Sequence, residues 1–310
     1  MRNELDSHLA AAQDILLAKY APETLIRPLR WSGGETQVLE LGSGPPLLLV
    51  HGGGDGAFEW VPILAPLAET NRVFAVDRPG HGMAEAFSYR GVDLLGHVRS
   101  FIGDILDALE LDSSNILANS IGGYWSAVFA LAEPQRVPRL VIAGAPPGVT
   151  REVPLPLRVM GTPLVGRPIG RLVMGTPSRE SSRKFWGQML VAHPERLSDE
   201  LLDVDVAHMR RTADDVRELL ALLIGPRGIR RGLTLGDRWG ALKVPTLFLV
   251  GEHDAFMTAR MATAWQSIAR ADPLVQLVRV DGAGHLPWID EPESVVAAIR
   301  RFLADGTARQ

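Results

Sequence analysis

The chain has 310 residues, of which 46% are apolar and 22% are charged, with a formal net charge of −4 and no cysteine. Such a length and balance are typical of a globular α/β protein. The absence of cysteine excludes disulfides, thiolate metal sites and a cysteine nucleophile, and the slight acidic excess argues against a nucleic-acid partner, because phosphate binding requires a basic surface.

The first twenty residues carry apolar side chains at helical spacing. This spacing predicts an amphipathic helix over residues 1–20 that packs on the core or on a neighbouring subunit; its apolar positions are Leu5, Leu9, Ala12, Ile15 and Leu16. Acidic residues stand where a signal peptide needs a basic start, and no run of about 18 apolar residues occurs. We therefore expect a cytoplasmic protein with no membrane partner, present as a monomer or a homodimer.

Short apolar runs recur along the chain and predict the strands of a sheet. They alternate with helical patterns, of which residues 93–111 are the clearest. Apolar strands that alternate with helices indicate a mostly parallel, doubly wound sheet covered on both faces, and functional residues gather beyond the carboxyl ends of such strands. The expected strands are residues 37–42, 47–50, 73–76, 115–118, 140–143, 246–250 and 275–280.

The alternation of strands and helices breaks between residues 147 and 235. That stretch is rich in proline and arginine, carries helical patterns and contains no convincing strand, and the strand rhythm resumes at Val244. We therefore expect one α/β core built from residues 1–146 and 236–310, with residues 147–235 inserted into it as a helical lid.

The expected lid carries two kinds of side chain that bear on a pocket. Its apolar residues predict a largely hydrophobic pocket wall, although most of them are expected to pack against the core; they include Phe185, Trp186, Met189 and Leu190. Its arginines are candidate partners for a carboxylate-bearing substrate, although such side chains more often lie in solvent; they are Arg151, Arg158, Arg167 and Arg171.

A serine, a carboxylate and a histidine each follow an expected strand. Ser120 lies in ANSIGG, Asp254 in GEHDAF and His285 in DGAGHLPW. A strand–serine–helix turn with the order serine, acid, histidine is typical of α/β hydrolases, and the sequence resembles that superfamily over nearly its whole length. The resemblance implies an α/β fold of the α/β-hydrolase type with an inserted helical lid.

These three residues suit nucleophilic catalysis. A serine hydroxyl is a weak nucleophile and needs a base, so Ser120 is expected to attack while His285 takes its proton. Asp254 would fix the imidazole tautomer; an acid one strand earlier is disfavoured, because the turn GAPPG holds no carboxylate. The tetrahedral oxyanion needs two backbone N–H donors. Ile121 supplies one by position, and the resemblance implies Gly53 for the other.

Other residues near the expected catalytic groups are expected to have supporting roles. Gly54 and Trp288 are the expected substrate contacts, His51 is expected to brace the oxyanion loop, and the resemblance makes His81 a turn residue. No cofactor is expected, because no Lys-Ser/Thr pair follows the glycines at 52–54. No cluster of His, Asp and Glu has the spacing of a metal site. The expected partner is a small-molecule substrate.

The motifs resemble those of more than one class of α/β hydrolase. HGGGDGA and ANSIGG resemble carbon–carbon bond hydrolases of ring meta-cleavage products, but Asp55 replaces a proline and Ala118 a glycine. The segment LPWIDEP after His285 resembles esterases and lactonases instead. We therefore expect a hydrolase of carboxylic esters or lactones. A carbon–carbon hydrolase of a vinylogous diketone acid is the alternative, and a non-catalytic small-ligand binder on the same fold is a third.

Overall fold

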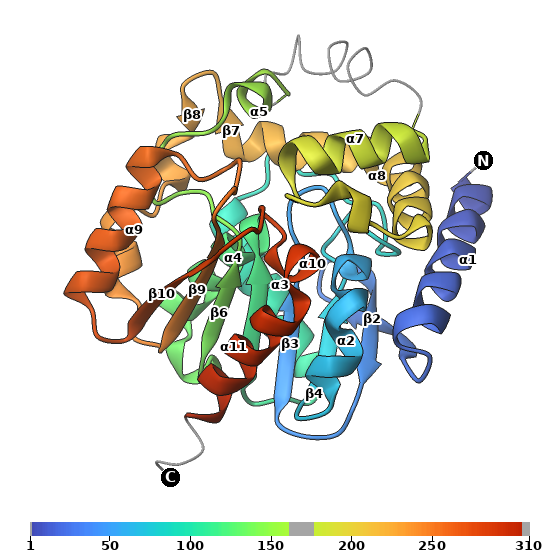
Figure 1. Cartoon of the computed structure of the whole chain (residues 1–310), viewed down its shortest axis with the longest axis horizontal. Helices are drawn as coiled ribbons and strands as arrows, with labels where there is room; N and C mark the ends of the chain where they lie inside the picture. The colour runs from blue at the N-terminus through green and yellow to red at the C-terminus, as the bar shows by residue number, and fades with distance from the viewer. Residues whose placement is uncertain (1, 161–176, 306–310) are drawn as a thin grey trace.

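The computed structural model describes residues 2–160 and 177–305, and an eight-stranded sheet forms its centre (Figure 1). The strand order is β1-β2-β4-β3-β5-β6-β9-β10; the pairs β1–β2 and β2–β4 are antiparallel, and the other neighbouring pairs are parallel. The mostly parallel sheet and its expected strands are confirmed. The bounds are β1 Leu25–Trp31, β2 Gly34–Leu41, β3 Pro46–Val50, β4 Arg72–Val76, β5 Asn115–Asn119, β6 Leu140–Ala143, β9 Thr246–Gly251 and β10 Val275–Val280.

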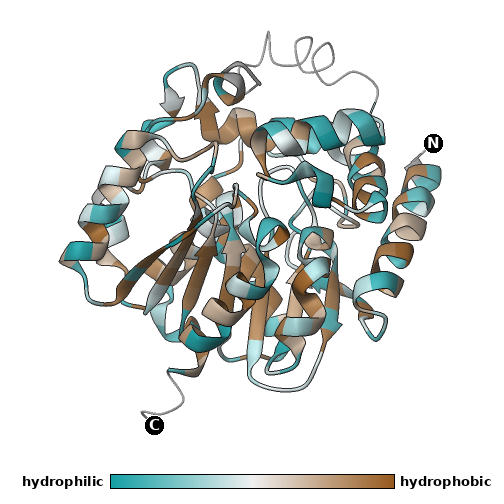
Figure 2. Ribbon diagram, viewed as in Figure 1, coloured by the Kyte–Doolittle hydropathy of each residue, from teal (hydrophilic) through white to brown (hydrophobic). Residues whose placement is uncertain are grey.

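Helices cover both faces of the sheet, which explains why its central strands are apolar throughout. In β3, Leu48 and Val50 belong to one buried cluster, whereas Leu47 and Leu49 belong to the other, because successive strand residues point to opposite faces. The hydropathy view shows apolar strands between helices with polar outer surfaces (Figure 2). One face holds α3 Leu94–Ala108, α4 Ser120–Ala132 and α9 Ala259–Ala271, and the other holds α2 Val61–Ala68 and α11 Pro292–Ala304.

Strand β1 was absent from the sequence prediction. It lies at the edge of the sheet and contains Pro28, which has no N–H to donate. Proline is tolerated only at such edges, and four of the seven residues of β1 are exposed. An edge strand with this composition lacks the apolar run that marked the inner strands.

Helix α1 (Arg2–Tyr20) confirms the predicted N-terminal helix and packs on α8 (Asp199–Leu223) and α2. Leu9 and Leu16 are buried as expected, but Ile15 is 61% exposed. A polar residue, Gln13, is buried instead, and its side-chain oxygen accepts a hydrogen bond from Gln37 at 3.0 Å. The buried face of α1 is therefore rotated from the one that hydrophobic spacing alone predicts.

Between residues 147 and 235 the described part of the chain is mainly helical: α5 Leu155–Met160, α7 Arg179–Met189 and α8 Asp199–Leu223. These helices lie at the end of the sheet where the parallel strands finish (Figure 1). The expectation of no strand needs a correction, because β7 (Ile224–Gly225) and β8 (Gly228–Ile229) form a small hairpin. Two-residue strands are too short to leave a periodic pattern, and this hairpin stays separate from the large sheet. No helix in the described ranges is long and apolar enough to cross a membrane.

Candidate active site

Ser120 occupies a strained turn between β5 and α4. Its φ is +47°, in the left-handed region that non-glycine residues seldom adopt, at a cost of roughly 1–2 kcal/mol. The glycines after it let α4 approach the sheet. A Cβ on Gly122 would lie 2.3 Å from the carbonyl oxygen of Val50, and one on Gly123 would lie 2.6 Å from Ile142. The turn therefore holds the serine at the carboxyl end of the sheet, and small, buried Ala118 precedes it in β5.

Asp254 and His285 form a buried pair beside that turn. His285 Nδ1 lies 2.9 Å from each carboxylate oxygen of Asp254. Two backbone N–H groups also donate to the carboxylate, from Ala145 at 2.8 Å and from Phe256 at 2.9 Å. Burial alone would raise the pKa of Asp254, but His285 and these hydrogen bonds bring it below its ordinary value. An ionised Asp254 keeps the proton of His285 on Nδ1 and leaves Nε2 free to act as a base.

Two further polar residues hold this geometry, and sequence reasoning had given them no role. Asn119 donates from Nδ2 to the carbonyl oxygens of Ala143 (2.8 Å) and His285 (3.4 Å), which ties β5 to β6 and to the histidine loop. The Asp290 carboxylate accepts hydrogen bonds from the N–H groups of Ala192, His193 and Gly284. The only sequence signals were their positions, Asn119 beside the serine and Asp290 in α10 (Pro287–Asp290) after the histidine.

Histidines brace the loop that follows β3, as expected for His51. His51 Nε2 accepts from the N–H of Arg78 at 2.9 Å, and His51 Nδ1 lies 2.9 Å from the carbonyl oxygen of Gly52. His81 reaches the same loop, with Nε2 3.2 Å from the carbonyl oxygen of Gly53. Burial lowers the pKa of both histidines well below the ordinary value, so both are neutral.

Two buried side chains, Arg78 and Glu59, hold Gly52 from both sides. The Arg78 guanidinium donates to the carbonyl oxygen of Gly52, and the N–H of Gly52 donates to the Glu59 carboxylate at 3.2 Å. Trp288, expected as a substrate contact, lies behind this loop: it is fully buried, stacks on Trp60 at 4.2 Å and donates to the Glu59 carbonyl oxygen at 2.9 Å. It does not line the cavity described next, and its place is a packing position under the loop.

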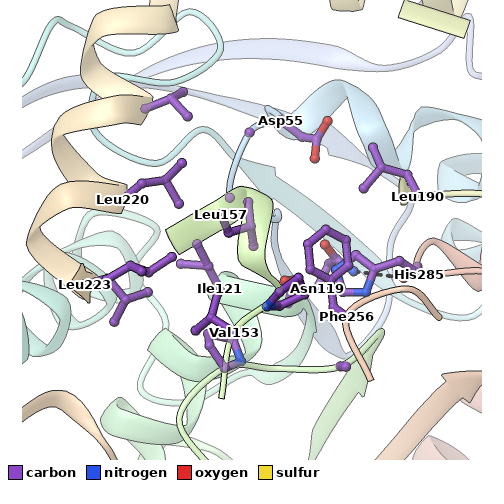
Figure 3. Close-up of a pocket in the computed structure, with 18 of the residues that line it drawn as sticks. Asp55, Asn119, Ile121, Val153, Leu157, Leu190, Leu220, Leu223, Phe256 and His285 are labelled. Atoms are coloured by element: carbon purple, nitrogen blue, oxygen red, sulfur yellow. Dashed lines mark hydrogen bonds between the residues drawn. The ribbon is translucent and has the colours of Figure 1, made fainter. Parts of the chain in front are cut away.

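Ser120 and His285 line a cavity of about 180 Å³. Figure 3 shows His285 and other residues of its wall. Gly53 and Ile121 lie together in its wall, where a Cβ on Gly53 would come 2.6 Å from Ile121 Cδ1. Gly54, the other expected substrate contact, lines it too. Their roles toward an oxyanion or a substrate stay predictions.

Helices α5, α7 and α8 supply much of the cavity wall. Among the apolar residues singled out in the sequence, Phe185 and Leu190 line the cavity. Trp186 is fully buried, and partly buried Met189 packs against the same core cluster. The wall between the helices and the sheet is mostly apolar, and includes Val153, Leu157, Val216, Leu220, Leu223 and Phe256.

Two of the four arginines proposed as carboxylate partners, Arg151 and Arg158, lie outside the cavity wall and bind backbone carbonyl groups. Arg151 donates to the carbonyl oxygen of Ile229 at 2.9 Å, and Arg158 donates to that of Pro226 at 3.0 Å, so both hold the β7–β8 hairpin. Arg167 and Arg171 lie outside the described residues. Arg217 does line the cavity, and its guanidinium is paired with Asp214.

Acidic residues in the cavity wall were missed by the sequence analysis. Asp55 and Asp205 both line it and are 6% and 3% exposed. Burial raises the pKa of Asp55 to about 6 and that of Asp205 to about 7. Within residues 2–160 and 177–305, no group of three or more His, Cys, Asp or Glu residues is arranged to hold a metal ion.

Comparison with known proteins agrees with the fold. The model of the Alpha/beta hydrolase family matches residues 47–298. Carboxylesterase CesB (YbfK) from Bacillus subtilis has a similar structure, with a TM-score of 0.76 and 22% identity over 97% of this chain and 98% of its own. The meta-cleavage product hydrolase CumD from Pseudomonas fluorescens IP01 has a TM-score of 0.70 and 23% identity over 90% and 97% of the two chains.

A curated relative is similar at the sequence level. The 2-hydroxy-6-oxononadienedioate/2-hydroxy-6-oxononatrienedioate hydrolase of Cupriavidus pinatubonensis is 29% identical over 218 residues, which cover 68% of this chain and 71% of the relative. The similar proteins thus include an esterase and two carbon–carbon hydrolases. Their names therefore do not determine which type of bond this protein cleaves.

Proposed function

The chain belongs to the alpha/beta hydrolase family, and on that premise we propose that it is a serine hydrolase of carboxylic esters or lactones. The observation that carries the proposal is the arrangement at one cavity wall. A serine in a left-handed turn and a histidine hydrogen-bonded to a buried aspartate, 2.9 Å away, both face the same cavity. This is the combination that nucleophilic acyl transfer requires.

In the proposed reaction Ser120 Oγ attacks the substrate carbonyl carbon while His285 Nε2 takes the hydroxyl proton. The N–H groups of Gly53 and Ile121 stabilise the negative charge on the carbonyl oxygen. The tetrahedral intermediate then breaks its bond to the alcohol oxygen, which receives the proton from His285. Water, deprotonated by His285, attacks the acyl-serine and releases the carboxylic acid and the free enzyme.

Ionised Asp254 contributes by orienting His285 and by stabilising the imidazolium that forms in each half-reaction. The two backbone N–H donors on its carboxylate prevent it from rotating away from Nδ1. The neutral buried histidines of the oxyanion loop do not compete for the proton, because burial holds their pKa far below that of a working base.

We also propose that residues 147–235 act as a lid. The support is the cavity wall itself, to which α5 contributes Leu157, α7 contributes Phe185 and α8 contributes Leu220. A cover of this kind excludes bulk water and provides an apolar surface for the substrate.

Hydrolysis of a carbon–carbon bond remains the second candidate. It is favoured because the proteins similar to this chain include a 2-hydroxy-6-oxononadienedioate hydrolase and a meta-cleavage product hydrolase. That reaction needs a cation for the carboxylate of the vinylogous diketone acid. In the described part of the cavity wall the arginine is Arg217, already paired with Asp214, while Asp55 and Asp205 add negative character. These charges favour an uncharged ester or lactone as the substrate.

A substrate panel tests the proposal. Purified protein is assayed with short p-nitrophenyl esters, γ- and δ-lactones and a 2-hydroxy-6-oxo-dienoate, alongside the Ser120→Ala variant. We expect turnover of esters or lactones that the variant lacks. Rapid loss of the dienoate chromophore with negligible ester cleavage would establish the carbon–carbon reaction instead. A protein that binds these compounds without turning any of them over would be a ligand binder.

A further inference from the structure

The cavity has two chemically different ends. On α8, the lining residues Asp205, Met209, Val216, Leu220 and Leu223 follow one another at three-, four- and seven-residue spacing, so they lie along one face of the helix. Asp205 and Leu220 are about four turns apart, or roughly 20 Å along the axis. Figure 3 shows Leu220 and Leu223 at the left of the cavity, Asp55 near its top and His285 at the right.

The acidic end is built from two elements that are far apart in the sequence. Asp55 comes from the loop after β3 and Asp205 from α8, and the charge of Asp55 contributes to the raised pKa of Asp205. The Ser182 hydroxyl on α7 donates a hydrogen bond to the Asp205 carboxyl group. Glu59 is the polar neighbour of Asp55, and it is itself a buried acid.

The two arginines near this end are engaged elsewhere. Arg78 donates to the Gly52 carbonyl oxygen, and Arg211 is paired with Asp6 and bonded to the carbonyl oxygens of Gly82 and Ala84. In the described part of the chain neither Asp55 nor Asp205 forms an ion pair. Burial of a carboxyl group is unfavourable and raises the pKa of both groups, although nearby His285 offsets part of this increase for Asp55.

Such an end suits one class of substrate group and opposes another. A hydroxyl or ammonium group entering it would donate a hydrogen bond to a carboxyl oxygen that faces the cavity. A substrate carboxylate would instead meet the negative charge of Asp55, whose pKa of about 6 leaves it mainly ionised at neutral pH, in a medium where such repulsion is poorly screened. The apolar end, with Leu157, Leu220 and Leu223, suits an alkyl or aryl group.

We propose that Asp55 and Asp205 form a specificity-determining subsite that selects substrates carrying a hydrogen-bond donor, a hydroxyl or an ammonium, at the end opposite their hydrocarbon group. This inference rests on the proposed ester or lactone hydrolysis at Ser120. It narrows the substrate class to amphipathic esters or lactones with a polar, non-acidic end, and it makes carboxylate-bearing substrates poor ones.

Matched esters test the subsite. One series varies the acyl end: p-nitrophenyl hexanoate with a methyl, hydroxyl, ammonium or carboxylate group at its terminal carbon. A second series varies the alcohol end in the same way on hexanoate esters of butanol. We expect kcat/KM for the best donor-bearing ester to exceed that of its carboxylate partner by at least about tenfold in one series. The preferred donor then identifies the natural group as hydroxyl or ammonium.

Variants assign the preference to the two acids. Asp55→Asn and Asp205→Asn conserve side-chain volume, and each should lower the donor-to-carboxylate ratio by roughly fivefold or more. Asp203→Asn is the matched control, because Asp203 lies on the same helix but faces outward and pairs with Arg179. It should leave the ratio unchanged. Inhibition of the wild-type protein by hexylamine, hexanol and hexanoate gives the same ranking without any variant.

The outcomes separate the subsite from the reaction. Hydrolysis of the unsubstituted esters with a donor-to-carboxylate ratio near one in both series would overturn the subsite and leave the proposed function standing. A ratio that persists in both asparagine variants would also overturn it. Failure to hydrolyse any ester, together with failure of Ser120 to react with a fluorophosphonate, would overturn the proposed function itself and the subsite with it.

Discussion

Two buried carboxyl groups beside the same cavity have opposite electrostatic environments. Asp254 faces His285 and two backbone N–H donors, and these partners lower its pKa although burial alone would raise it. Asp205, at the acidic end of the cavity, has the Ser182 hydroxyl and the nearby acid Asp55, and its pKa rises to about 7. The Asp254 carboxylate has all its partners within the chain. Asp205 has no ion-pair partner among the described residues, and we interpret the acidic end as a place where a ligand completes the site.

The largest effect is expected at the reacting groups. Ser120→Ala and His285→Ala should each reduce kcat by a factor on the order of 10⁴ or more, because the triad acts as a unit. Steady-state assays on the best ester, with circular dichroism to verify the fold, measure this. Retention of about a tenth of wild-type activity on every substrate would contradict the assignment.

The Asp254→Asn variant tests the carboxylate whose hydrogen-bond partners all lie within the chain. The amide keeps the shape but can hold the wrong tautomer of His285, so kcat should fall by roughly 10³–10⁴. KM should change far less than kcat, because Asp254 does not touch substrate. A nearly neutral Asp254→Asn beside an essential second acid would show that the acid had been placed at the wrong strand.

Asp205→Asn tests the acidic end of the cavity through the pH dependence of stability. A carboxyl whose pKa is higher in the folded chain than in the unfolded one stabilises the fold below the unfolded value, near 3.8, and this contribution is lost as pH rises through about 7. Relative to wild type, the variant should therefore gain about 1–3 kcal/mol in the free energy of unfolding between pH 4 and pH 8. Urea denaturation at the two pH values measures the gain. A constant difference would mean that Asp205 is not held in its protonated form.

The smallest effect concerns Trp288, which lies behind the loop that follows β3. Trp288→Phe keeps an aromatic ring against Trp60 but loses the hydrogen bond to Glu59. The free energy of unfolding should fall by about 1–2 kcal/mol, while KM for uncharged esters stays within about twofold, because the side chain is outside the cavity wall. A large rise in KM with unchanged stability would restore Trp288 as a substrate contact.

Much of the fold was predictable because the inner strands are apolar on both faces. Runs such as residues 47–50 and 140–143 predict a parallel sheet with helices on both faces. Ser120, Asp254 and His285 could be recognised because each follows the end of a predicted strand. Edge strand β1 was missed because Pro28 and its exposed residues break that pattern. The exposure of Ile15 depends on which helices α1 meets, and local spacing does not contain that information.

The polar parts of the site were harder to predict, for a different reason. Asn119 and Asp290 act through hydrogen bonds to loops distant in sequence, such as the one that carries His285. The meeting of Asp55 with Asp205 requires α8 to lie over the loop after β3. These relations arise from tertiary packing, so the residue types alone could suggest a hydrolase but not the chemistry at the far end of its cavity.

Trapping the covalent intermediate tests the central claim most directly. The wild-type protein is mixed with an ester it turns over slowly, quenched in acid within the first turnovers, and digested for mass spectrometry, with Ser120→Ala treated in parallel. The account predicts a burst of alcohol release and an acyl adduct on the peptide that contains Ser120. Rapid turnover without any adduct, or an adduct on another residue that persists in Ser120→Ala, would contradict it.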